Sequence, residues 1–150
     1  MFDLNFYNGK KVLVTGHNGF KGSWMCSVLN KLGADVIGIS IEPPTDPSLF
    51  YISKLDDIVR SENCDVRNLK KLLTIFKREQ PEIVFHLAAQ PIVRMGYTDP
   101  VLTYETNVMG TVNICECIRQ SNTVKSFLNV TTDKVYFNDD SGREFMTLSA

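Results

Sequence analysis

One short stretch constrains the fold of this chain more than any other: the apolar run from Val12 to Val14 is followed at once by three glycines spaced three apart. Gly16 can take backbone angles closed to other residues, Gly19 lets a ligand approach the backbone, and Gly22 lets the next helix pack closely on the strand. Between a strand and a helix, this spacing predicts a site for the two phosphates of a dinucleotide, held by free N–H groups. A plain structural glycine turn is the alternative.

The remainder of the chain alternates between apolar runs of strand length and segments with helical spacing. The pattern predicts strands over residues 11–15, 36–40, near 58–63, 83–88 and 127–130, and helices over residues 19–32, 69 to before 81, and 100–120. Such alternation indicates an α/β fold, a Rossmann-like doubly wound parallel sheet with helices on both faces, truncated after about five strands. In the first helix Trp24, Val28 and Leu32 share one face, and Leu49 to Tyr51 are expected to rejoin the core after a proline-rich loop.

The charge balance argues against a polyanionic partner. Lysine and arginine number 16 against 17 acidic residues, and no basic run is interleaved with aromatic residues, so nucleic acid is not expected as a partner. The first residues lack the basic and apolar regions of a signal peptide, and no segment reaches the roughly 18 apolar residues of a membrane span. We therefore expect no membrane partner and a cytoplasmic protein.

The four cysteines match no metal-binding spacing. Cys26 and Cys64 stand alone, whereas Cys115 and Cys117 lie two apart in a helical pattern and so face different ways. A cytoplasmic α/β chain keeps its thiols reduced, so buried free cysteines are predicted. We assign no metal site.

The end of the second strand bears on the choice of dinucleotide. The acidic residue that often holds the adenosine ribose is replaced there by Ser40, with Glu42 two residues on. No Arg or Lys closely follows Ser40 to neutralise a 2′-phosphate, which favours NAD over NADP. After the third strand, Asp65 is placed to accept a hydrogen bond from the adenine amino group, and an N-cap of the next helix is the alternative role for Asp65.

Five segments together carry a resemblance to a known family. They are residues 16–24 (GHNGFKGSW), 43–50 (PPTDPSLF), 86–91 (HLAAQP), 107–111 (NVMGT) and 131–134 (TTDK). On these segments the chain resembles the extended short-chain dehydrogenases/reductases over roughly residues 8–137, and among them the sugar-nucleotide 4,6-dehydratases that act on CDP-glucose. The narrower markers are Lys21, the double proline, Gln90 with Pro91, and Asp133 with Lys134.

The resemblance implies NAD as the cofactor and a nucleotide-sugar, CDP-glucose, as the substrate. The cofactor-binding residues predicted from the motifs and the family are Gly16, Asn18, Gly19, Phe20, Gly22, Ser40, Asp65, Val66, Leu87, Ala88, Ala89 and Asn107. The implied reaction removes hydride from C4 of the sugar, eliminates water across C5 and C6, and returns the hydride at C6. In this reaction Thr132 is expected to hydrogen-bond the sugar near its C4 hydroxyl, Asp133 to protonate the departing C6 hydroxyl, and Lys134 to take the place of the C5 base. A strand-end turn capped by Asp133 is the alternative interpretation.

Neither histidine is nominated as catalytic, and His86 is predicted to be a partly buried residue held by hydrogen bonds. Enzymes of this family carry a YxxxK pair after strand five, and this chain shows that spacing only at Tyr7 and Lys11, ahead of strand one. We interpret the match as coincidental and expect the isolated chain to be inactive.

These expectations set the predicted domain boundaries. Residues 1–137 are predicted to be an incomplete NAD-binding domain without a substrate domain, and residues 138–150 a divergent tail that we hypothesise is read out of frame. A homodimer is expected of the family, with half of its interface missing here. A non-catalytic dinucleotide-binding module and a nucleotide-sugar epimerase or reductase are the alternatives.

Overall fold

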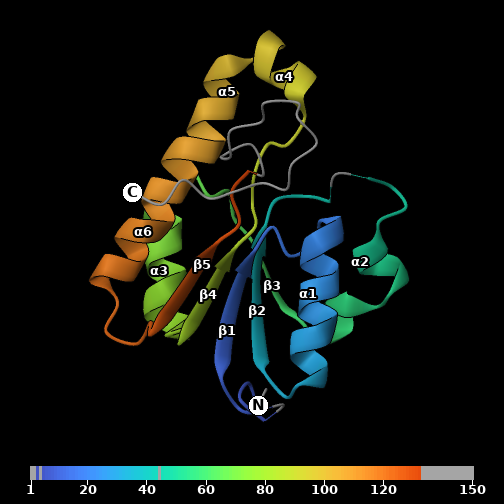
Figure 1. Cartoon of the computed structure of the whole chain (residues 1–150), viewed down its shortest axis with the longest axis vertical. Coiled ribbons are helices and arrows are strands. Elements are labelled where there is room, and N and C mark those ends of the chain that lie inside the picture. The colour runs from blue at the N-terminus through green and yellow to red at the C-terminus, as the bar shows by residue number, and fades with distance from the viewer. Residues whose placement is uncertain (1–2, 4, 44, 133–150) are drawn as a thin grey trace, which may run out of the picture.

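Five parallel strands form a single sheet in the computed structural model of the chain, which describes residues 3, 5–43 and 45–132 (Figure 1). The strands are β1 (Lys11–Thr15), β2 (Asp35–Ser40), β3 (Arg60–Asn63), β4 (Ile83–His86) and β5 (Ser126–Asn129). Their order across the sheet is β3-β2-β1-β4-β5, and every neighbouring pair is parallel. The predicted fold class and the five predicted strands are confirmed.

Helices cover both faces of the sheet, as predicted (Figure 1). They are α1 (Phe20–Lys31), α2 (Leu49–Ile52), α3 (Leu69–Glu79), α4 (Val93–Thr98), α5 (Pro100–Tyr104) and α6 (Gly110–Gln120), with a 3₁₀ turn η1 (Leu55–Asp57) and a π-helical turn η2 (Glu105–Met109). The predicted helix over residues 100–120 is therefore interrupted, because η2 joins α5 to α6. No local sequence pattern marks this turn. Within the described residues, no helix combines the length and apolar character needed to cross a membrane.

Alternation along the central strands divides the core into two clusters, because successive side chains of a strand point to opposite faces. On one face Val12 packs with Leu29 of α1 and Phe50 of α2. On the other face Leu13 packs with Leu72 of α3 and with Ile114 of α6. These two layers fix the helix beginnings at the carboxyl edge of the sheet, where the predicted site lies.

The face of α1 that carries Trp24 and Val28 is not the face that packs on the sheet. Trp24 and Val28 are exposed at 57% and 50%, whereas Ser23, Cys26 and Leu29 face the sheet. The buried face of α1 thus combines the small residues Gly22, Ser23 and Cys26 with the larger Leu29. A simple count of apolar positions cannot reveal this.

Three smaller predictions have mixed outcomes. Phe50 rejoins the core as predicted, but Tyr51 is exposed. Cys26, Cys64 and Cys117 are buried free thiols, whereas Cys115 is exposed, so the expectation of buried cysteines is wrong for that residue. Its exposure follows from the two-residue spacing, which puts Cys115 and Cys117 on different helix faces.

Candidate functional site

The turn between β1 and α1 is the centre of the candidate site. Gly16 has a φ of +69°, a left-handed conformation that favours glycine, and a Cβ there would lie 2.9 Å from the Cα of Ala88. The Gly16 N–H donates to the carbonyl of Ile39 at 2.8 Å, and the Gly19 N–H donates to the carbonyl of Gly16 at 3.1 Å. The turn is thus closed on itself and bonded to β2.

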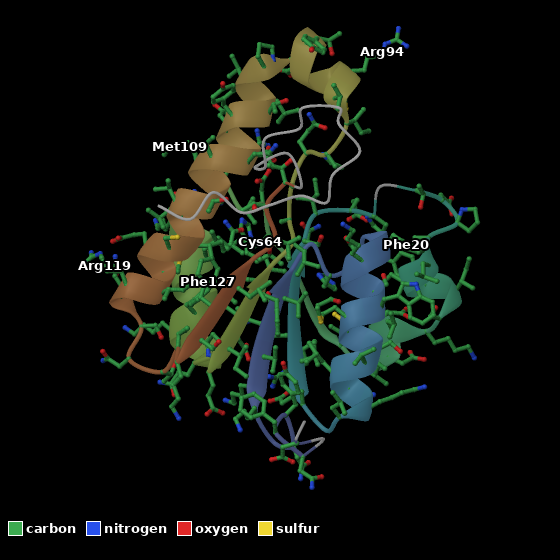
Figure 2. The ribbon with its side chains drawn as sticks, viewed as in Figure 1. Phe20, Cys64, Arg94, Met109, Arg119 and Phe127 are labelled. Atoms are coloured by element: carbon green, nitrogen blue, oxygen red, sulfur yellow. The ribbon has the colours of Figure 1, made fainter. Side chains whose placement is uncertain are left out.

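Helix α1 begins directly after this turn and carries no side-chain cap. Its N-cap residue is Gly19, and no side-chain hydrogen bond is made there. The first N–H groups of a helix have no intrahelical partner, and they lie at the positive end of the helix dipole. A Cβ on Gly22 would overlap the carbonyl oxygen of Gly16, so only glycine permits this approach. The arrangement suits a pyrophosphate, and Phe20 projects from the same helix start (Figure 2).

Asn18 and Ser40 are brought together at the end of β2. The Ser40 hydroxyl donates to Asn18 Oδ1 at 2.6 Å, and Asn18 Nδ2 donates to the carbonyl of Ile41 at 2.6 Å. Glu42 follows and accepts a hydrogen bond from Asn63 Nδ2 at 3.3 Å. Glu42 is thus the first acidic residue after β2, two residues beyond the end of the strand.

The elements α5, η2 and α6 follow one another without a break and are together called the long helix below. His86 is buried between β1 and this long helix, with 2% of its surface exposed, and it is held by hydrogen bonds as predicted. The Thr111 hydroxyl donates to the carbonyl of Asn107 at 2.7 Å, so its oxygen must accept from His86 Nε2, at 3.2 Å. His86 Nδ1 is then unprotonated and accepts from the Thr15 hydroxyl at 2.6 Å. Burial lowers the pKa of His86 to about 4, so the ring stays neutral at physiological pH.

The segment after β4, residues 87–92, is called the β4 loop below. The backbone N–H groups of Leu87 and Ala88 donate to Thr15 Oγ1 at 3.2 and 3.1 Å. Asn107 then holds Gln90 through both ends of its side-chain amide: Oδ1 accepts from Gln90 N at 2.7 Å and Nδ2 donates to Gln90 O at 3.1 Å. Asn107 therefore positions the β4 loop, and both polar atoms of its side-chain amide are engaged by the Gln90 backbone.

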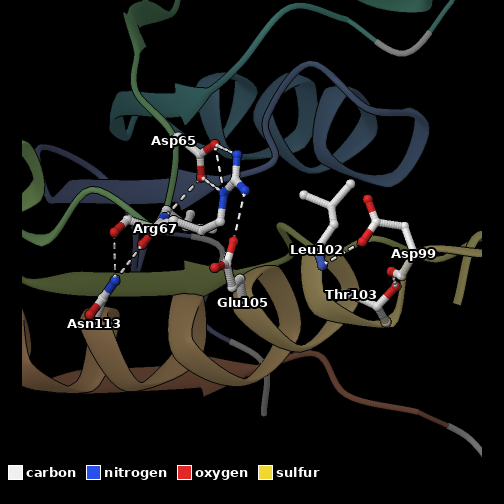
Figure 3. A network of polar contacts seen from close by, with 8 residues as sticks. Asp65, Arg67, Asp99, Leu102, Thr103, Glu105 and Asn113 are labelled. Carbon is white, nitrogen blue, oxygen red and sulfur yellow. Dashed lines mark hydrogen bonds and ion pairs between the residues drawn. The ribbon is translucent and has the colours of Figure 1, made fainter.

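The segment after β3, residues 64–68, is called the β3 loop below (Figure 3). Arg67 forms an ion pair with Asp65 at 2.7 Å and a second with Glu105 of η2 at 3.2 Å. The hydrogen bond from the Arg67 side chain is the main cause that lowers the pKa of Asp65. Asn113 of α6 donates to the carbonyls of Val66 and Arg67 at 2.9 and 3.1 Å. A hollow of about 590 Å³ lies between this loop and the long helix.

The alternative role for Asp65, as the N-cap of α3, is wrong. The cap is Asn68, whose side chain accepts from Lys71 N at 3.0 Å. Asp65 instead accepts from the backbone N–H of Arg67 at 2.8 Å and closes a turn ahead of the helix.

The other predicted residues have varied placements. Thr132 is exposed and follows β5 at the carboxyl edge, whereas Asp133, Lys134 and the tail over residues 138–150 lie outside the described residues. Lys11 opens β1, at the opposite edge from Gly16, which agrees with a coincidental YxxxK match. His17 is buried and donates to or accepts from Ser61 Oγ at 2.8 Å. In the described part of the chain, no group of three or more His, Cys, Asp or Glu side chains is arranged to hold a metal ion.

Sequence reasoning missed three residues that shape the site: Thr15, Arg67 and Gln90. Thr15 has a findable signal, because a polar residue ends an otherwise apolar strand just before the glycine turn. Arg67 has none, because its partner Glu105 lies 38 residues away in the chain. Gln90 stands out in the sequence only as a family marker, and its contact with Asn107, 17 residues away, has no local signal.

The site lies where the strand order reverses. Chain connections leave β1 and β4 toward opposite sides of the sheet, and open α/β sheets bind ligands at the carboxyl ends of such strands. The fold and the glycine turn define a dinucleotide-binding α/β protein of the Rossmann type. The family model for the NAD dependent epimerase/dehydratase family matches residues 12–149, and the chain belongs to this family, whose cofactor is NAD.

Known proteins support this assignment. The chain is similar to CDP-glucose 4,6-dehydratase of Salmonella typhimurium, with 49% identity over 138 residues, which cover 92% of this chain and 38% of that protein. An epimerase structure from Methanothermobacter thermautotrophicus is similar with a TM-score of 0.81 at 26% identity, over 97% of this chain and 43% of that one. UDP-glucose 4-epimerase from Thermus thermophilus, in complex with NAD, gives a TM-score of 0.64 at 30% identity, over 75% of this chain and 35% of that one. The chain thus spans less than half the length of these relatives.

Proposed function

We propose that this chain is the NAD-binding part of a nucleotide-sugar 4,6-dehydratase that acts on CDP-glucose. The observation that carries the cofactor part of the proposal is the start of α1, where Gly19 makes no side-chain cap beside the turn at Gly16. The 49% identity to a CDP-glucose 4,6-dehydratase supports the choice of reaction and substrate. The domain boundary at residue 137 is part of this proposal.

The site residues fit NAD in an extended arrangement along the carboxyl edge. We place the pyrophosphate at the uncapped start of α1, over Gly16, Gly19, Phe20 and Gly22. The remaining positions follow from the strand order. The adenosine ribose lies near Asn18 and Ser40, the adenine near Asp65 and Val66 of the β3 loop, and the nicotinamide ribose near Leu87, Ala88 and Ala89 of the β4 loop.

The carboxylate of Glu42 supports NAD rather than NADP. It lies beyond Ser40, beside Asn63, where a 2′-phosphate would add a second negative charge. Like charges in one place raise the cost of binding. We expect the dissociation constant for NADP to exceed that for NAD by at least about tenfold.

Bound NAD supplies a hydride acceptor, and the residues after β5 are proposed to act on the sugar. Thr132 donates a hydrogen bond near the C4 hydroxyl, whose proton the tyrosine of the family's YxxxK pair would take as the hydride leaves C4. Asp133 gives a proton to the C6 hydroxyl as it leaves, Lys134 receives the C5 proton, and the hydride then returns to C6. The support is that Thr132 follows β5 at the same edge as the glycine turn. A lysine base requires a lowered pKa, so the role of Lys134 depends on desolvation or a nearby cation.

A non-catalytic dinucleotide-binding module is the second candidate. It rests on the turn at Gly16 and the start of α1 at Gly19 without a side-chain cap, which would hold NAD in such a module as well. Such a module binds NAD and makes no product. We further propose that the chain works in the cytoplasm, where its cysteines stay reduced, and that the dehydratase is a homodimer.

Incubation of the chain with NAD and CDP-glucose tests the proposed reaction and substrate, and formation of product would exclude the non-catalytic module. The readout is the alkaline absorbance of a 4-keto sugar, with UDP-glucose as the substrate control and heat-inactivated chain as the blank. Product from CDP-glucose alone supports the dehydratase with its substrate. NAD binding without product agrees with the module and equally with the expected inactivity of the isolated chain, whereas product from both sugars contradicts the choice of CDP-glucose.

A further inference from the structure

Residues of the π-helical turn η2 and of α6 make two sets of contacts, which reach opposite ends of the proposed NAD site. Glu105, Gly110 and Asn113 contact the β3 loop: Glu105 pairs with Arg67, Asn113 donates to two loop carbonyls, and a Cβ on Gly110 would lie 2.7 Å from Val66 Cγ2. These contacts hold the loop that we place at the adenine.

Two other residues, Asn107 of η2 and Thr111 of α6, hold the β4 loop and the end of the strand that precedes it. Asn107 is bonded twice to the backbone of Gln90, at 2.7 and 3.1 Å. Thr111 accepts from His86 Nε2 at 3.2 Å, at the end of β4. One helix thus fixes both the β3 loop and the β4 loop, which leave the sheet from different strands.

The arithmetic of the helix shows why η2 is needed. In an unbroken α-helix each residue advances by about 100°, so Gly110 would lie about 140° and Asn113 about 80° around the axis from Glu105. A π turn contains one residue more than an α-helical turn. The residues that follow it are therefore rotated back about the helix axis by about 100° relative to an unbroken α-helix. Gly110 and Asn113 then lie only about 40° and 20° from Glu105, on one face toward the β3 loop.

We propose that the π-helical turn is a positioning element of the NAD site, because its extra residue lets one helix hold the β3 loop and the β4 loop at the same time. The inference rests on the proposed function in assigning these two loops to the cofactor. π turns are rare, and they occur frequently at functional sites.

Deletion of Val108 tests the proposal, because it removes the extra residue and leaves every contacting side chain in the chain. Val108 is half exposed, and Val108→Ala keeps the residue count, so it is the matched control. We expect the deletion to raise the dissociation constant for NAD by at least about tenfold and Val108→Ala to change it by less than about twofold. Both proteins are first checked for a cooperative thermal transition.

Hydrogen exchange in the cofactor-free chain separates failure of this inference from failure of the proposed function. The Gln90 amide, bonded to Asn107 Oδ1, is expected to exchange at least about tenfold faster in the deletion than in Val108→Ala. If the chain binds no NAD, the proposed function is contradicted. The exchange rate of the Gln90 backbone N–H still tests whether the π turn positions the β4 loop. Equal Gln90 exchange and equal NAD affinity in the two variants overturn the inference.

Two substitutions keep the test decisive if the deletion does not fold. Asn107→Ala releases the β4 loop, and Asn113→Ala releases the β3 loop. With AMP as a probe of the adenine end, Asn113→Ala is expected to weaken AMP and NAD binding alike, whereas Asn107→Ala weakens NAD binding and leaves AMP within about twofold. The same loss of AMP affinity in both variants, or no loss of NAD affinity in either, overturns the inference.

Discussion

The strand–helix junctions β1–α1 and β3–α3 have the same position in the sheet but differ in how the start of the helix is capped. Both begin a helix at the carboxyl edge of the same parallel sheet. Helix α3 is capped by its own Asn68, which accepts from Lys71 N, whereas α1 begins at Gly19 with no side-chain cap. The Asn68 side chain thus already engages the Lys71 amide at the start of α3, whereas no side chain caps the start of α1, where we propose that phosphate oxygens bind.

The two junctions also differ in what fixes them. Around β1 the contacts are buried and close, with Gly22 against Gly16 and Thr15 bonded to His86. Around β3 an ion pair with Arg67, whose side chain is 39% exposed, carries much of the contact. We therefore expect the β1 junction to be sensitive to added volume and to acid, and the β3 junction to respond weakly and in a salt-dependent way.

The largest expected effect comes from Gly22→Ala. The added Cβ overlaps the carbonyl oxygen of Gly16, so the backbone must move, and we expect the free energy of unfolding to fall by about 3 kcal/mol. Chemical denaturation followed by circular dichroism measures it. Gly96→Ala is the matched control, because the nearest atom to its Cβ lies 3.9 Å away. Equal stability of the two variants would contradict the close contact between Gly22 and the Gly16 carbonyl oxygen at the β1 junction.

Acid is expected to have the second largest effect. An unfolded histidine has a pKa of about 6.5, whereas burial lowers the pKa of His86 to about 4 and also lowers that of His17. The unfolded chain therefore binds more protons between these values, and the free energy of unfolding falls as the pH drops from about 6.5 to about 4. For His86 alone the loss is at most about 3 kcal/mol.

Denaturation curves at several pH values, compared between the unsubstituted chain and His86→Gln, isolate this contribution. The carboxylates that titrate below about pH 5 are present in both proteins and cancel in the comparison. We expect a flatter pH dependence in His86→Gln. Parallel curves contradict a buried, neutral His86 at the β1 junction.

Removal of the α3 cap is expected to have a moderate effect. Asn68→Ala leaves the Lys71 N–H without its acceptor, and we expect a loss of about 1 kcal/mol in the free energy of unfolding. Asn68→Asp keeps an acceptor at the same place and is expected to retain that stability. If Asn68→Asp loses as much as Asn68→Ala, the contrast between a capped and an uncapped helix start fails.

The smallest effect is expected at the ion pairs of the β3 loop. Arg67→Met removes the pairs with Asp65 and Glu105 but keeps an apolar stem, and we expect a loss of about 0.5 kcal/mol at low salt. Salt screens exposed charges, so the difference from the unsubstituted chain is expected to vanish at high NaCl concentration. A loss that persists at high salt shows that the β3 junction is held by more than exposed charge.

The same contrast explains what the sequence predicts well. The β1–α1 turn depends on Gly16, Gly19 and Gly22, which are close in the chain, so spacing alone predicts it. The packing face of α1 was mistaken because Ser23 and Cys26 are buried by close approach, while the larger Trp24 points outward. Size and apolarity therefore select the wrong face of α1, although they select the right one in α3, where Leu72, Ile75 and Phe76 are buried.

Contacts across the sheet edge follow no local period, and sequence reasoning could not supply them. Arg67 meets Glu105, and Gln90 meets Asn107, only because the strand order brings the β3 and β4 loops to one helix. The π turn that makes both contacts possible leaves no mark in the apolar pattern. Sequence reasoning thus predicts Asn107 as a site residue and misses what it does.

Calorimetric titration with NAD tests most directly the claim that the uncapped start of α1 holds the pyrophosphate. We compare the unsubstituted chain with Gly19→Asp and with Asn68→Asp on α3. The carboxylate introduced by Gly19→Asp would accept from the first N–H groups of α1 and repel the phosphates of NAD. A Cβ on Gly19 lies 3.4 Å from the nearest atom, so this variant has room to fold. We predict NAD binding by the unsubstituted chain and by Asn68→Asp, and a loss of at least about a hundredfold in Gly19→Asp. Absence of NAD binding by the folded chain, or unchanged affinity in Gly19→Asp, would contradict the account.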